Sequence, residues 1–150
     1  MYKRQEQGSR FPAYTPIVAG GEHACILHYV ENDQTLNDGD LVLVDAGGEY
    51  ECYASDITRT YPVNGKFSDE QLAVYKVVLE AHKQAIEAVK TGNHIMQPQE
   101  ISERVITEGL VDLGILDGKT EDLLEEGAHK NFYMHKVGHW IGLDLSLIHI

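Results

Sequence analysis

Residues 44–62 read VDAGGEYECYASDITRTYP, and this stretch decides how the rest of the chain is interpreted. It is rich in valine, threonine and tyrosine, which are frequent in β-strands, and it ends at Pro62, so it predicts a hairpin of two paired strands. Each arm also carries an aspartate, Asp45 or Asp56, where the pattern calls for an apolar or neutral residue. Whether the two carboxylates meet depends on where the turn lies.

Two positions for this turn are compatible with the sequence. A two-residue turn at Gly47-Gly48 is favoured by turn chemistry and would pair Asp45 with Tyr50. A turn centred on Tyr50-Glu51 would place Asp45 directly opposite Asp56, where opposed Cβ atoms lie about 4.5 to 5.5 Å apart. Two carboxylates at that distance repel each other unless a proton or a cation lies between them.

Only the second register explains why both residues are acidic, and it predicts a site for divalent cations such as Mn²⁺ or Mg²⁺. In that register Leu43, Ala54 and Thr58 share the face of the aspartates, which is a mainly apolar neighbourhood. The alternative is that Asp45 and Asp56 are solvated residues on the outer face of an edge hairpin, since most aspartates are exposed.

Length and charge limit the classes of protein and partner. The chain has 150 residues, of which 43% are hydrophobic, so we expect one soluble globular domain. Its net charge of -12 would repel polyanions, and we expect neither nucleic acid nor a membrane as a partner. Cys25 and Cys52 are too few for a disulfide framework, and no secretory signal precedes them, so we expect a cytoplasmic protein.

The order of the expected elements favours an α+β fold, with an antiparallel sheet and covering helices. Ser68 and Gln71 form a capping-box pattern that predicts a helix up to Gly92. Its apolar stripe is expected to comprise Leu72, Tyr75, Val78, Ala81 or His82, Ala85 and Val89. A second helix is expected to end at Gly114, and a short third one to lie in 120–130. Further strands are predicted at 16–19, 24–29 and 131–144.

Several histidines could add a ligand to the two carboxylates. His135 and His139 are four residues apart and would share one face of a strand. His28 lies within an expected apolar strand, where it requires a polar partner if it is buried. Each of the three is alternatively an ordinary half-buried histidine.

Three blocks, ACILHYVEN, VDAGGEYECYASDITRTYPVNGKFS and FYMHKVGHWIGLD, resemble the catalytic domain of the Xaa-Pro aminopeptidases. These are proline-specific members of the pita-bread metallopeptidases, which also include prolidase and methionine aminopeptidase. The resemblance covers about residues 11–144 and implies a partial pita-bread fold. It also implies removal of the N-terminal residue that precedes proline in peptides, with two divalent metal ions, expected to be Mn²⁺.

The resemblance implies a role for each candidate residue. Asp45 would chelate one metal ion, Asp56 would bridge both, and His139 would bind the second. His28 and His135 would line the substrate site, where they position the scissile carbonyl or carry a proton. The alternatives within this fold are prolidase and a peptide-binding module that has lost its metals.

The two ends of the chain depart from the family pattern. In that pattern a further histidine and two glutamate ligands follow the last block, whereas LSLIHI follows here. We expect residues 1–5 and 145–150 to be non-native, and 6–144 to be the N-terminal part of a catalytic domain. This chain should then bind metal weakly and have negligible peptidase activity, whereas the full-length protein is expected to be active and to form a homo-oligomer.

Overall fold

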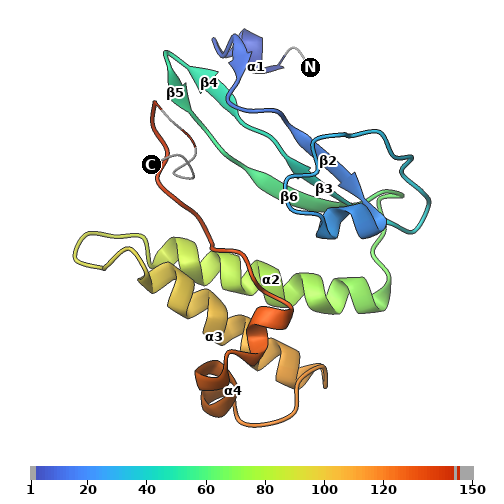
Figure 1. Ribbon diagram of the computed structural model, residues 1–150, viewed down its shortest axis with the longest axis vertical. Coiled ribbons are helices and arrows are strands. Elements are labelled where there is room, and N and C mark those ends of the chain that lie inside the picture. Colours follow the sequence, from blue (N-terminus) through green and yellow to red (C-terminus); the bar gives the residue numbers. More distant parts are fainter. Residues whose placement is uncertain (1–2, 144, 146–150) are drawn as a thin grey trace. The chain divides into compact units, whose positions relative to one another are not determined.

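The computed structural model describes residues 3–143 and residue 145 (Figure 1). The chain divides into two compact units. Residues 1–67 and 139–150 belong to the first, which we call the sheet unit, and residues 68–138 form the second, which we call the helical unit. The expected non-native ends fall largely on residues 1–2 and 146–150, which lie outside the described residues, and that expectation stays a prediction.

The sheet unit contains two small antiparallel sheets. The first has the strand order β2-β3-β6 and comprises β2 (Ile17–Gly20), β3 (Leu41–Asp45) and β6 (Thr58–Pro62). The second has the order β1-β4-β5 and comprises β1 (Phe11–Pro12), β4 (Gly48–Tyr50) and β5 (Tyr53–Ala54). A short helix, α1 (Lys3–Glu6), precedes them, and a 3-10 helix, η1 (Gly21–Cys25), follows β2. Ile17, Ala19 and Tyr29 form the buried core of this unit.

The predicted hairpin is present, but both turn positions considered for it were wrong. Tyr50 pairs with Tyr53, so the turn residues are Glu51 and Cys52, with φ of 49° and 69°. Two successive positive φ values are typical of a type I′ turn, which usually selects asparagine and glycine. Glu51-Cys52 carries no such signal, and the prediction placed the turn one residue earlier, at Tyr50-Glu51, because that register pairs the two aspartates.

Moving the turn by one residue moves the register by two. Asp45 pairs with Thr58. The prediction that Asp45 lies directly opposite Asp56 was therefore wrong. Because side chains alternate between faces with a period of two, a shift of two residues keeps both aspartates on the same face. The register was wrong, whereas the shared face follows from either register.

Two further predicted strands are absent from the described residues. Within 24–29, Ala24 and Cys25 belong to η1, and His28 has φ of 57°, which a strand does not allow. Gly21, at φ of 54°, turns the chain out of β2 before this segment begins. In 132–143 the described residues form no strand, although the Ala54 N–H donates to the Gly142 carbonyl at 2.7 Å.

The helical unit confirms the expected helices. It contains α2 (Asp69–Glu87), α3 (Gln97–Asp112), α4 (Thr120–Glu126) and a 3-10 helix, η2 (Ala128–Asn131). Ser68 and Gln71 form the predicted capping box, with reciprocal hydrogen bonds of 3.2 and 2.9 Å. No helix among the described residues is long and apolar enough to cross a membrane.

The apolar face of α2 differs in part from the predicted stripe. Ala81 and Ala85 are buried as expected, whereas Val78 is 50% exposed and Val89 is 73% exposed. Val77 packs instead against the core of the helical unit, which contains Ala81, Ile106 and Leu110. The alanines let α2 and α3 approach closely, so the contact face is narrower than the apolar pattern suggested.

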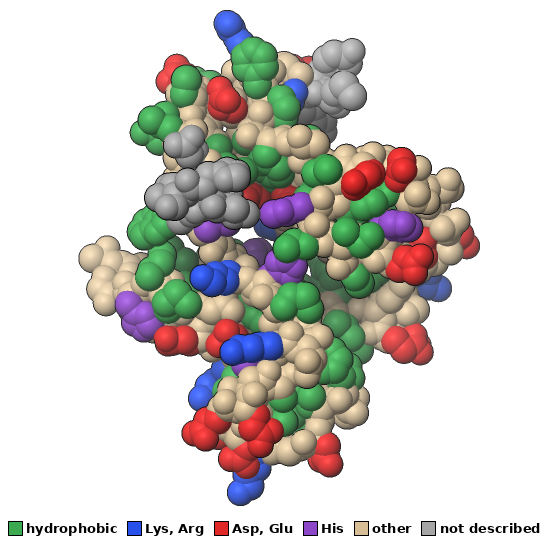
Figure 2. Space-filling view, in the orientation of Figure 1, with side chains coloured by type: hydrophobic (Ala, Val, Ile, Leu, Met, Phe, Trp, Pro, Cys, Tyr) green, Lys and Arg blue, Asp and Glu red, His purple; other side chains and the backbone are tan. Residues whose placement is uncertain are grey.

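Acidic side chains gather over α4 in the space-filling view (Figure 2). Its sequence is TEDLLEE, and Leu123 is its buried residue. The charge that led us to exclude polyanionic partners therefore lies partly on this helix, and the exclusion itself stays a prediction.

Gly109 on α3 sets the distance between α2 and α3. A Cβ at Gly109 would lie 2.3 and 2.6 Å from the two γ-carbons of Val77. Alanine would gain about 1 kcal/mol of helix propensity, but overpacking at such distances costs about 1 to 3 kcal/mol. We therefore expect Gly109→Ala to lower the free energy of unfolding by about 1 kcal/mol, measured by urea denaturation.

A double variant provides the control for this prediction. In the Val77→Ala background both γ-carbons are gone and the nearest remaining atom is the Cβ of residue 77 at 3.0 Å, so Gly109→Ala should cost clearly less. Equal destabilisation in the two backgrounds would contradict the proposed contact.

Candidate metal centre

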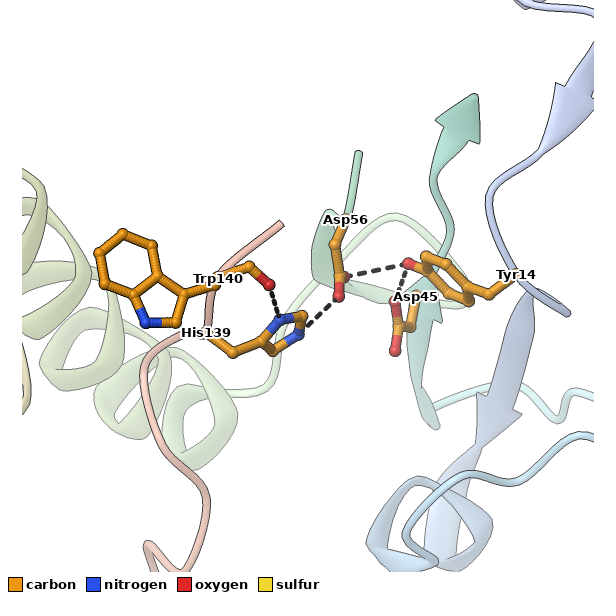
Figure 3. A network of polar contacts seen from close by, with 5 residues as sticks. All are labelled: Tyr14, Asp45, Asp56, His139 and Trp140. Carbon is orange, nitrogen blue, oxygen red and sulfur yellow. Dashed lines mark hydrogen bonds and ion pairs between the residues drawn. The ribbon is translucent and has the colours of Figure 1, made fainter. Parts of the chain in front are cut away.

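Four polar side chains meet in the sheet unit (Figure 3). Tyr14 lies in the segment between β1 and β2, and Asp45 is the last residue of β3. Asp56 lies between β5 and β6, and His139 begins the second stretch of chain that belongs to this unit. Four separate segments therefore contribute to one group of contacts.

Asp56 occupies the middle of this group. Its Oδ1 lies 3.1 Å from the Tyr14 hydroxyl, and its Oδ2 lies 3.1 Å from His139 Nε2. The Tyr14 hydroxyl also contacts Asp45 Oδ1. Both carboxyl groups are thus within hydrogen-bonding reach of one phenol oxygen. Asp45 and Asp56 are half-buried, and neither is a fully solvated residue of an outer face.

The contact of His139 Nδ1 indicates which tautomer the neutral ring adopts. Its Nδ1 lies 2.8 Å from the Trp140 carbonyl, which can only accept a hydrogen bond. We therefore assign the proton of the neutral ring to Nδ1. Nε2 then directs a lone pair at a carboxylate oxygen of Asp56, an arrangement that requires a proton or a cation between the two atoms. A backbone carbonyl on the second nitrogen is also the usual environment of a metal-binding histidine.

The hydroxyl of Tyr14 remains a proton donor in this site. Burial raises the pKa of Tyr14 above its usual value, and the neighbouring Asp45 and Asp56 raise it further. A phenol carries one hydrogen, so it can donate to only one of the two carboxylates at a time. The carboxylate oxygens and His139 Nε2 therefore outnumber the hydrogens available to them, which favours binding of a cation among these side chains.

These donors fit a divalent metal ion by their chemistry, although they are not gathered into a closed set. Among the described residues, no three His, Cys, Asp or Glu side chains converge closely enough to form a metal site without rearrangement. Asp45, Asp56 and His139 instead form a row, in which Tyr14 links the first two. Two carboxylates with one imidazole nitrogen suit Mn²⁺, Fe²⁺, Co²⁺ or Zn²⁺.

The two remaining candidate residues are not part of this row. His28 lies in an exposed turn of the sheet unit, in the left-handed conformation. His135 is an exposed residue of the helical unit, in a segment that the Val137 N–H ties to Gln99 Oε1 at 2.8 Å. Their placement in a substrate site stays a prediction.

Tyr14 was not among the site residues predicted from the sequence. It stands in FPAYTP, where two prolines restrict the backbone on both sides of it. That restriction was the available signal, but nothing local indicates that the side chain reaches residues 31 and 42 positions away.

Comparison with known proteins identifies the family. Residues 1–147 match the sequence pattern of metallopeptidase family M24. The chain belongs to this family. It is 59% identical over 137 residues to a Xaa-Pro aminopeptidase of Haemophilus influenzae, and 48% identical over 138 residues to that of Escherichia coli. These matches cover 91% and 92% of this chain, but the chain spans only about a third of each relative, 32% and 31%.

Solved structures of M24 proteins have the same fold as this chain. Pseudomonas aeruginosa aminopeptidase PepP superposes with a TM-score of 0.92 at 53% identity, over 96% of this chain and 33% of that protein. Zinc-substituted E. coli aminopeptidase P in complex with product gives 0.89 at 47% identity, over 94% and 32%. The predicted α+β, partial pita-bread fold and the resemblance to Xaa-Pro aminopeptidases are therefore confirmed. M24 aminopeptidases of this type are metal-dependent.

Proposed function

We propose that this chain is part of a Xaa-Pro aminopeptidase, which removes the N-terminal residue that precedes proline in peptides. The observation that carries the proposal is the row Asp45, Asp56 and His139, in which residues 83 positions apart lie 3.1 Å from each other. The identity of 59% to the Haemophilus influenzae enzyme supports the same assignment. The free, exposed Cys25 and Cys52 support a cytoplasmic location.

In this proposal Asp45, Asp56 and His139 together would bind two divalent ions, and Mn²⁺ is the expected metal. Asp45 would hold one ion, His139 the other, and Asp56 would be shared between them. When bound, such ions lower the pKa of a water molecule and polarise the scissile carbonyl. By the resemblance, His28 and His135 would position that carbonyl or carry a proton.

The row offers three donors, whereas the resemblance implies two further glutamate ligands. We therefore expect the purified 150-residue chain to bind Mn²⁺ or Co²⁺ weakly and to show no measurable cleavage of a Xaa-Pro-Yaa tripeptide. A chimera should restore cleavage. In it, residues 6–143 replace the matching segment of the Haemophilus influenzae relative, which supplies the remaining length.

The chimera is assayed on Xaa-Pro-Yaa tripeptides and on Xaa-Pro dipeptides, with and without a chelator. Metal-dependent cleavage of the tripeptides supports the proposal, whereas cleavage confined to dipeptides would indicate a prolidase. A folded chimera that binds peptide but holds no metal would indicate a non-catalytic module. Measurable cleavage by the 150-residue chain alone would show that three donors are sufficient.

A further inference from the structure

Within residues 3–143, the Tyr14 hydroxyl is the one polar group that contacts both aspartates. It lies 3.1 Å from Asp56 Oδ1 and also contacts Asp45 Oδ1. Asp45 pairs with Thr58 in the sheet, so the strand register alone does not bring the carboxyl groups face to face. The phenol therefore supplies the link that the hairpin lacks.

Tyr14 uses one oxygen of Asp56 and leaves the other for His139. The Tyr14 hydroxyl approaches Asp56 Oδ1, whereas His139 Nε2 approaches Asp56 Oδ2 at 3.1 Å (Figure 3). A cation between Asp56 and His139 would thus bind on the side of the carboxylate away from the phenol. At Asp45 the hydrogen bond of the Tyr14 hydroxyl is to Oδ1, so Oδ2 remains available to a cation.

The position of Tyr14 is fixed by the backbone around it. The Ala13 N–H donates to the Gly47 carbonyl at 3.0 Å, and a Cβ at Gly47 would lie 2.9 Å from the Tyr14 ring. The tyrosine ring therefore packs against the hairpin backbone between Asp45 and Asp56, where it is half-buried.

We propose that Tyr14 is a positioning residue of the candidate metal centre, which holds Asp45 and Asp56 on either side of one hydroxyl and donates its single hydrogen to one of them at a time. It acts through the carboxylates and does not itself bind metal. Partners of this kind typically contribute about 10- to 100-fold to metal affinity, because they fix the orientation of the ligands. This inference rests on the metal site proposed above.

The test is a titration of the 150-residue chain and its Tyr14→Phe variant with Co²⁺, whose visible absorption reports the ligands and geometry of the bound ion. Phenylalanine keeps the ring against Gly47 and removes only the hydroxyl. We expect the Kd for Co²⁺ to rise about 10- to 100-fold and the absorption spectrum to change, with an unchanged circular dichroism spectrum. Tyr61→Phe is the matched control, because Tyr61 lies on β6 of the same unit and is 51% exposed.

The remaining outcomes separate the two proposals. If Tyr14→Phe binds Co²⁺ with the same Kd and spectrum as the unchanged chain, the positioning role is wrong and the metal site stands. If the unchanged chain shows no Co²⁺ binding that depends on Asp56, both are wrong. If Tyr14→Phe fails to fold, the hydroxyl serves the fold and the positioning role is again wrong.

Discussion

Replacing Asp56 by asparagine should weaken the binding of Co²⁺ to this chain at least about 100-fold, which takes it to the limit of a titration. Asp56 is the middle member of the row, in contact with Tyr14 through one oxygen and with His139 through the other, each at 3.1 Å. Asparagine has nearly the same shape but no charge, and its amide nitrogen cannot accept a hydrogen bond or bind a cation. The variant therefore removes the bridge and leaves the surrounding packing in place.

Asp38→Asn is the matched control for the loss of charge. Asp38 is an exposed aspartate in the turn that precedes β3, in the same unit as Asp56. Both variants change the net charge by one, so a general electrostatic attraction of cations to the acidic chain would be weakened equally in the two. Equal Co²⁺ affinities for Asp38→Asn and Asp56→Asn would contradict a specific site at Asp56.

The helices could be predicted because their signals are local. The capping box of Ser68 and Gln71 marks the start of α2, and glycines at φ of 68° and 71°, Gly114 and Gly127, follow α3 and α4. Each signal acts within one turn of helix, so a short window of sequence contains all of it. The buried face of α2 was less predictable, because it depends on which residues of α3 approach it.

The metal centre could be predicted only in part, because its contacts join distant segments. Glu51-Cys52 adopts a turn that such residues rarely form, and this moved Asp45 away from the position opposite Asp56. Tyr14 then supplies the link between the carboxylates from a loop near the start of the chain. Residue types indicated which side chains are candidate metal ligands, whereas the way they are held together required the three-dimensional contacts.

Gly47 lies where three segments of the candidate metal centre meet, and its replacement by alanine should be the most destabilising change in the sheet unit. A Cβ at this position would lie 1.7 Å from the carbonyl oxygen of Ser55 and 2.6 Å from its carbonyl carbon. Both atoms belong to the backbone, so no side-chain rotation can relieve the overlap. We expect a loss of at least about 3 kcal/mol in the free energy of unfolding, or about 6 to 12 °C in Tm.

Alanine substitutions at two other glycines, Gly48 and Gly138, serve as controls with smaller expected effects. At Gly48 the nearest atom to an added Cβ is the Ser9 hydroxyl oxygen at 2.7 Å, which a side-chain rotation can move, so Gly48→Ala should cost less. At Gly138 nothing lies within 4 Å, and Gly138→Ala should leave the Tm unchanged. A Tm for Gly47→Ala close to that of Gly138→Ala would contradict the close approach of residues 47 and 55.

The loss at Gly47 should also extend to the candidate metal centre, since Gly47 lies two residues after Asp45 and an added Cβ would lie 2.9 Å from the Tyr14 ring. Any backbone shift that accommodates a Cβ must move Ser55, and with it the adjacent Asp56. We therefore expect Gly47→Ala to lose Co²⁺ binding even below its own Tm, where the rest of the chain is folded. Retention of the full affinity in a destabilised Gly47→Ala variant would show that the carboxylates are positioned independently of the hairpin backbone.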